Sequence, residues 1–183
     1  MIFACFAAVL PLLLGGGVKT ASAQKGVLEI RLKDHREAID DFSRLTIKIG
    51  KIAVSPKPGF AFWKAEWREL SPSTAAIDLT KYTGKESVVV FREMIGAGAF
   101  DAIQLKLNGL EGILKKNQRQ AAVKSILTPI KLSFSVEPKG ETVIVLDLVV
   151  LDMSDHPPRG YELGIQGYEV RIDGRLIDKI PPG

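Results

Sequence analysis

The sequence predicts an all-β fold, an antiparallel two-sheet β-sandwich with about 8 or more strands and at most short helical turns. Apolar residues recur at every second position from Val27 onward, and turn residues separate these alternating stretches. No stretch between them carries the apolar period of a long helix. Hydrophobic residues at 46% and charged residues at 25% are ordinary for a globular protein, and 183 residues suit one domain.

The first residues indicate export. Residues 2–14 form an apolar run that is too short to span about 30 Å of hydrocarbon, and the A-x-A pattern at 21–23 fits a secretory cleavage site. We therefore expect a signal peptide at 1–23 and a single β-sandwich domain at 24–183, in the periplasm, at the cell surface or outside the cell. The alternative is a buried N-terminal strand. Cys5 would leave with the signal, so the mature chain would have no disulfide, thiolate metal site or cysteine nucleophile. We also expect no transmembrane span in the mature chain.

The first two strands show the clearest alternation. Residues 26–34 place leucine and isoleucine between charged residues, which is typical of a strand with one buried face. Residues 44–54 repeat the pattern, and a change of parity at Gly50 predicts a bulge. Between them, residues 35–43 favour a short helical turn, because Ile39 and Phe42 lie three apart.

Further strands follow in chain order between turn signals. The stretch 142–152 is the most apolar of the mature chain, so we expect it at the centre of a sheet and partly buried on both faces. The dipeptide at 173–174, Asp-Gly, fits a type I′ hairpin turn. The other strands are predicted at 61–70, 75–79, 87–91, 100–107, 112–115, 120–124, 130–136 and 167–172.

The stretch MIGAGAFDAIQLKL, residues 94–107, raises the question of a phosphate-binding loop. A dinucleotide fingerprint needs a third glycine and a following helix, and this stretch has neither. Its glycines instead predict a backbone bend, with a positive φ at Gly96 or Gly98. The residues that then face the core are Ile103, Leu105 and Leu107.

From end to end the mature chain resembles an exported prokaryotic family known as domain of unknown function 4382. The similar pieces occur in the family's order and cover about Val27 to Asp155: LEIRLKD, FSRLTIKIGKIAVSP, WRELSPSTAAIDLTKYTGKESVVV, IGAGAFDAIQLKL and IKLSFSVEPKGETVIVLDLVVLD. The resemblance implies an exported prealbumin-like (transthyretin-like) or carboxypeptidase-regulatory-like β-sandwich with no known activity. The chain departs from the family where it has no lipobox cysteine, where Lys33 replaces a threonine and where Gly96 replaces a proline.

The sequence favours a non-enzymatic protein. A Ser-His-Asp site would have to use His35 or His156, both in predicted loops, and the G-x-S-x-G pattern of a nucleophile elbow is absent. No cofactor is expected apart from Ca²⁺, which oxygen ligands could bind. The candidate ligands are Asp34, Asp40 and Asp41, with Asp147, Asp152 and Asp155 late in the chain, although none has the spacing of a dedicated calcium loop.

Aromatic and basic residues give two candidates for binding. Trp63 and Trp67 share one face of the predicted strand 61–70, and exposed indoles bind sugar rings; packing of both under loops is the alternative. The cluster Lys115, Lys116, Arg119 and Lys124 is either a solvated hairpin tip or a contact for an anionic surface or polysaccharide. A mature net charge of about +3 is too small to predict nucleic-acid binding.

These observations predict an exported, non-enzymatic β-sandwich module for binding or assembly, with an envelope protein or polysaccharide as partner. The alternative is a carbohydrate- or ligand-binding periplasmic protein that uses the strand of Trp63 and Trp67. Exposed indoles beside a cleft would favour the alternative, whereas an open sheet edge would favour assembly. The oligomeric state is left open.

Overall fold

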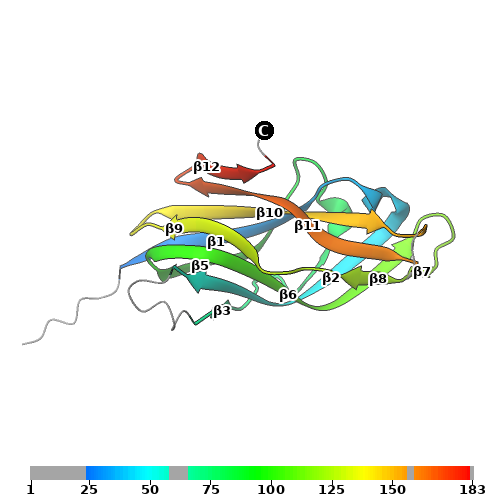
Figure 1. The fold of residues 1–183 in the computed structure, drawn as a ribbon, viewed down its shortest axis with the longest axis horizontal. Helices are drawn as coiled ribbons and strands as arrows, with labels where there is room; N and C mark the ends of the chain where they lie inside the picture. The colour runs from blue at the N-terminus through cyan, green and yellow to red at the C-terminus, as the bar shows by residue number, and fades with distance from the viewer. Residues whose placement is uncertain (1–23, 58–65, 156–158, 182–183) are drawn as a thin grey trace, which may run out of the picture.

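The computed structural model describes residues 24–57, 66–155 and 159–181, and in these ranges the chain forms two β-sheets that pack face to face (Figure 1). Twelve strands and two short 3₁₀ turns make up the regular structure there. The predicted all-β sandwich is confirmed. No helix in the described ranges is long and apolar enough to cross a membrane.

Sheet A contains the first and last strands of the chain. Its order is β12-β11-β10-β1-β5, and β8 (Val123–Ser125) pairs with the part of β11 that β12 leaves free. The bounds are β1 (Lys25–Asp34), β5 (Val88–Gly96), β10 (Glu141–Asp152), β11 (Tyr161–Ile172) and β12 (Arg175–Ile180).

Sheet B is built around the two longest strands, β2 (Phe42–Pro56) and β6 (Gly98–Leu114). Shorter strands flank them: β3 (Arg68–Leu70) and β4 (Ala76–Asp78) pair with β2, while β7 (Gln120–Ala121) and β9 (Ile130–Val136) pair with β6. The predicted bulge at Gly50 is confirmed, because the β2–β6 register shifts on both sides of Ile49.

Two pairings depart from the predicted antiparallel order. β1 runs parallel to β10, from Val27 opposite Glu141 to Asp34 opposite Leu148, and β8 runs parallel to β11. The reason is the path of the chain, which crosses repeatedly between the sheets, so that strands far apart in sequence become neighbours. Parallel strands need such long connections, and alternation within one strand does not reveal its partner.

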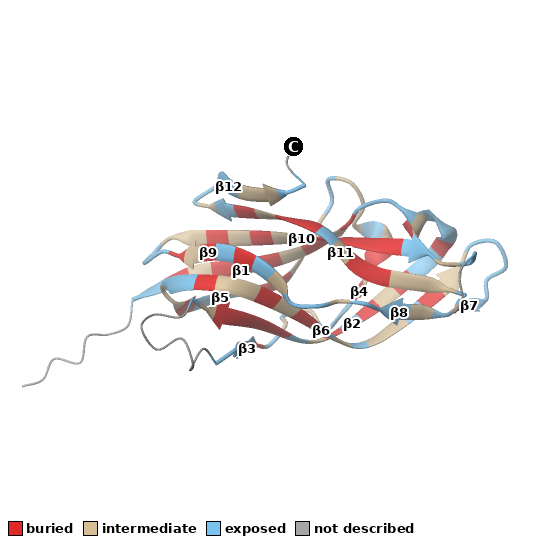
Figure 2. Cartoon of the chain, viewed as in Figure 1, coloured by how far each residue is buried: buried red, intermediate tan, exposed pale blue. Residues whose placement is uncertain are grey.

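The core lies between the sheets and uses the alternation of the long strands (Figure 2). β10 is central, as predicted: Ile144, Leu146, Leu148 and Val150 are all fully buried toward the core. Val149 on the opposite face is also buried. At the end of β1 the predicted helical turn is confirmed as a 3₁₀ turn, η1 (Ala38–Asp41), whose Ile39 packs in the core.

The glycine stretch is a crossing between sheets. β5 ends in sheet A at Gly96 and β6 begins in sheet B at Gly98, so the intervening residue carries the chain across. Gly98 has a positive φ of 159°, a value close to that of ordinary extended backbone. Ile103 and Leu105 are buried as predicted, whereas Leu107 is only half-buried.

The last strand follows the predicted hairpin turn. Asp173 and Gly174 have φ values of 49° and 78°, and positive φ at both central residues is what a type I′ turn requires. β12 then pairs with β11 from Ile172 opposite Arg175 to Tyr168 opposite Ile180. The predicted strand at 61–70 is described only from Glu66 onward, where β3 occupies 68–70.

Candidate functional site

The outer edge of β12 has no neighbouring strand in the described part of the chain. Its only strand partner there is β11. The opposite edge of sheet A differs, because the backbone of β5 accepts hydrogen bonds from the loop between β3 and β4: Ser73 N–H donates to the Val90 carbonyl at 2.8 Å, and the Thr74 hydroxyl to that of Val89 at 3.4 Å. β12 is therefore the more open of the two edges.

Exposed apolar side chains accompany this open edge. Three of the six residues of β12 are large, exposed apolar side chains: Leu176 at 52%, Ile177 at 57% and Ile180 at 48%. Native edge strands normally carry charges, prolines or bulges that discourage pairing with another chain. β12 has such features, namely a bulge at Ile177 and charged residues at 175, 178 and 179, but its three apolar side chains remain outside.

An apolar groove of about 470 Å³ runs beside β11 and β12. The segment at 126–131 forms its other wall, and its apolar lining consists of Ile126, Ile130, Val149, Leu151, Ile165 and Ile180. A second hollow, of about 520 Å³, lies between β9 and β12. There Tyr168 O–H donates to the Asp178 carboxylate at 2.9 Å, and burial together with this carboxylate raises the tyrosine pKa.

The outer face of sheet A carries rows of charged side chains across β5, β1, β10 and β11. In one row Glu29 of β1 accepts hydrogen bonds from Arg31, at 2.5 Å, and from Arg92 of β5. Burial acts to raise the pKa of Glu29, but the hydrogen bonds and charges of the two arginines outweigh it and hold the pKa below its usual range. Arg92 also pairs with Glu141 at 2.7 Å.

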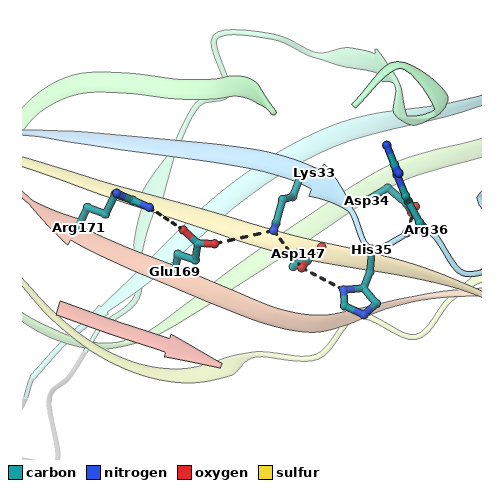
Figure 3. A network of polar contacts seen from close by, with 7 residues as sticks. All are labelled: Lys33, Asp34, His35, Arg36, Asp147, Glu169 and Arg171. Carbon is teal, nitrogen blue, oxygen red and sulfur yellow. Dashed lines mark hydrogen bonds and ion pairs between the residues drawn. The ribbon is translucent and has the colours of Figure 1, made fainter. Parts of the chain in front are cut away.

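A second group on this face joins three strands (Figure 3). The Lys33 ammonium lies 3.2 Å from the Asp147 carboxylate and 3.9 Å from that of Glu169, and Arg171 lies 3.2 Å from Glu169. His35 Nδ1 is 3.2 Å from the same oxygen of Asp147. Beside these groups is a hollow of about 490 Å³, whose charged lining is Arg31, Lys33, Lys85, Glu169 and Arg171.

The candidate calcium ligands do not form a metal site in the structure. Across the described residues, no three His, Cys, Asp or Glu side chains gather where they could hold a metal. Asp34 is buried at the end of β1, Asp40 is exposed, and the Asp41 carboxylate accepts a hydrogen bond from Tyr161 at 3.0 Å. Asp152 caps a turn through Ser154 N–H, and Asp155 is exposed in that turn.

Asp34 is nevertheless an unusual carboxyl group. One oxygen accepts a hydrogen bond from Arg36 N–H at 2.7 Å, while the other is buried without a partner in the described structure. Burial raises the pKa of Asp34 to about 6, and the nearby charge of Asp147 adds to the shift. One oxygen of Asp147 is likewise buried without a partner there.

The aromatic and basic candidates are only partly placed. Trp67 is 40% exposed just before β3, and it lines neither the groove nor the hollows described above. Trp63 and His156 lie outside the described residues. Lys115, Lys116 and Arg119 are exposed at the β6–β7 hairpin and Lys124 is exposed in β8, which agrees with both the solvated tip and the anionic contact.

Two surfaces stand out in the structure that the sequence pattern does not predict. Arg31, Lys33 and Arg171 lie on predicted strands, but alternation shows only that they face solvent and not that β1 and β11 flank the same strand. Leu176, Ile177 and Ile180 follow a recognised hairpin turn, and this apolar run after the turn is the signal that could have located the edge.

In a comparison with protein-family models, the model described as "Domain of unknown function (DUF4382)" matches residues 25–163. No curated protein and no solved structure matches the chain.

Proposed function

The chain belongs to this family of unknown function, and we propose that it is an exported, non-enzymatic β-sandwich module that assembles with an envelope protein by adding an extended segment of that protein to β12. The observation that carries the proposal is the open edge of β12 with its three exposed apolar side chains. The apolar run and A-x-A pattern at the N-terminus support export.

The chemistry of the edge favours an extended polypeptide as the partner. An unpaired strand offers a row of N–H and C=O groups, which match the backbone of another strand and give affinity with little dependence on sequence. Apolar side chains at alternate positions of the incoming segment would enter the groove beside β11, whose lining includes Ile126 and Ile165. Specificity would therefore come from the groove and affinity from the edge.

Photo-cross-linking in cells that export the protein tests this proposal. A photoreactive residue in place of Ile177 is expected to give adducts with an apolar, extended segment of another envelope protein, mapped by mass spectrometry. The same residue in place of Lys116, at the exposed hairpin tip, is the control position. Adducts at 177 that are no more abundant than those at 116 would overturn the proposal.

A pair of matched substitutions distinguishes strand pairing at the edge from nonspecific contact with exposed apolar surface. Ile177→Lys places a charge on the edge strand and should abolish the adducts of a photoreactive residue placed at 176. Met94→Lys makes the same change at a methionine that is 61% exposed in β5 and should leave them intact. Equal loss in both variants would mean that exposed apolar surface, and not the edge, holds the partner.

A carbohydrate-binding function through the tryptophans is the second candidate, supported by the exposure of Trp67. An exposed indole offers a flat apolar face to a sugar ring. If this function holds, Trp63→Ala and Trp67→Ala should each abolish retention on a polysaccharide column without changing the melting temperature. Unchanged retention in both variants would exclude it.

A further inference from the structure

We propose that the hollow on the outer face of sheet A is a second binding site, for a ligand with at least two carboxylate, sulfate or phosphate groups, as in an acidic oligosaccharide. Four cationic side chains line the hollow, Arg31, Lys33, Lys85 and Arg171, against the single carboxylate of Glu169. This site lies on a face of the sheet and does not depend on pairing at the β12 edge.

The strand register sets the shape of the site. The β10 residues Val143 and Val145 form its floor, because Arg31 of β1 pairs with Val145, and Arg171 of β11 pairs with Val143. β1 and β11 flank β10, so their backbones are roughly 10 Å apart at a strand spacing of about 4.8 Å. Lys85, in the loop before β5, supplies a third side.

The depth of the charges makes the outer layer cationic. The carboxylate side chains lie low, with exposed fractions of 2% for Glu29, 10% for Asp147 and 19% for Glu169. Arg31 and Arg171 lie higher, with 39% and 45%, whereas Lys33 is 19% exposed, level with Glu169. The acids therefore hold the cations from below, and each guanidinium keeps donors for an anion that approaches from solvent.

Lys85 adds a cation that is not neutralised by a neighbour. It makes no ion pair with the residues that the structure describes, whereas Lys33 and Arg171 share Glu169. Anionic groups on opposite sides of the valine floor could then contact Lys85 and Arg31 on one side and Arg171 on the other. The apolar floor suits the C–H face of a sugar ring between them.

Calorimetric titration of the exported protein with defined probes tests the site. Trigalacturonate supplies carboxylates on a sugar chain, tripolyphosphate supplies anions without sugar, and cellotriose is the neutral sugar. We expect trigalacturonate or tripolyphosphate to bind and cellotriose to bind at least about tenfold more weakly, with affinity that falls as salt rises. Binding of tripolyphosphate alone would identify phosphate as the recognised anion, and binding of trigalacturonate alone would identify the acidic sugar; either supports the site.

Charge-reversal variants decide whether this hollow is the site. Lys85→Glu should lower the affinity for the anionic probe by at least about tenfold, because it places a carboxylate where the ligand's anion would lie. Arg171→Gln, which removes a positive charge, should also lower this affinity. Lys57→Glu makes the same charge change at an exposed lysine just after β2, in sheet B, and should alter affinity less than about twofold. Unchanged melting temperatures show that the variants remain folded.

Three results would overturn the proposal. These are no binding of either anionic probe by the unmodified protein, equal affinity for cellotriose, or equal weakening by Lys85→Glu and Lys57→Glu. The last result would show that the net charge of the protein, and not the hollow, attracts the anion.

Discussion

Asp34 and Glu29 are both buried carboxyl groups of β1, yet their pKa values shift in opposite directions. Glu29 lies beneath two arginines, which favour its charged form. Asp34 faces the other side of the strand, where burial and the nearby charge of Asp147 disfavour the charged form. The alternation of the strand thus places one carboxyl in an ion-pair network and the other in a site where burial outweighs the opposing charge of His35.

Asp34 should make the protein less stable as pH rises from 3.8, its usual pKa, to about 6, because the folded state then binds the proton more tightly than the unfolded state. A shift of this size corresponds to at most about 3 kcal/mol. Asp34→Asn should remove this loss, and its oxygen can still accept from Arg36 N–H. Denaturant unfolding at pH 4 and pH 7.5 measures this change in the free energy of unfolding, and Asp155→Asn, at an exposed position, is the control. An identical pH dependence in Asp34→Asn and the unmodified protein would contradict the assignment.

Glu29 should behave in the opposite way. Because its folded-state pKa lies below 4.5, its contribution to stability is present above that pH and is lost as the pH falls through the folded value. Glu29→Gln should cost about 1–2 kcal/mol at neutral pH, since its arginine partners are partly exposed. The same unfolding measurement should show the difference vanish in acid. A cost that persists undiminished below the folded pKa would mean that packing, and not charge, is responsible.

At the scale of elements, β12 depends on a close approach that only glycine permits. A Cβ on Gly167 of β11 would lie 1.9 Å from the carbonyl oxygen of Ile180, which is backbone and cannot move aside as a flexible side chain could. Gly167 sits where the β10–β11 register shifts beside Asp147. The end of β12 is therefore attached at a position with no room for a side chain.

Gly167→Ala should detach the end of β12 while the rest of sheet A persists. We expect large amide chemical-shift changes at residues 178–180 and a smaller loss of overall stability, because the added Cβ would meet the backbone of β12 and not that of β10, although Asp147 of β10 pairs with Gly167. Gly96→Ala is the control, since its Cβ would come no nearer than 3.6 Å to Arg68. Undisturbed β12 amides in Gly167→Ala would show that the two strands can separate enough to accept a Cβ.

At the scale of the whole molecule, the fold was more predictable than the sites. Alternation and turn residues predicted most strands, the central position of β10 and the final hairpin, because these depend on local sequence and on burial. The parallel pairing of β1 with β10 was not predictable, since it depends on crossings between the sheets. The hollow shares this limit: Arg31 and Arg171 lie about 140 residues apart in the chain and meet only through that pairing.

The calcium prediction, which concerns the carboxylates at and after the end of β1, can be tested directly. Asp34, Asp40 and Asp41 do not gather into a three-ligand group in the structure, because Asp41 turns to Tyr161 and Asp34 is buried beside Arg36. We therefore expect the same melting temperature in excess Ca²⁺ and in excess chelator. Ligand binding to the folded state raises stability in proportion to the logarithm of ligand concentration, so a rise of several degrees in Ca²⁺ would support the calcium prediction.

The open edge of β12 is most directly tested by amide hydrogen exchange of residues 175–180, measured in the purified protein and in the protein bound in its native envelope. If β12 takes an extended segment of another protein, alternate amides of this strand should exchange rapidly in the purified protein and become protected in the envelope, because a new strand accepts hydrogen bonds from every second N–H. Equal exchange of these amides in the two samples would contradict assembly through this edge.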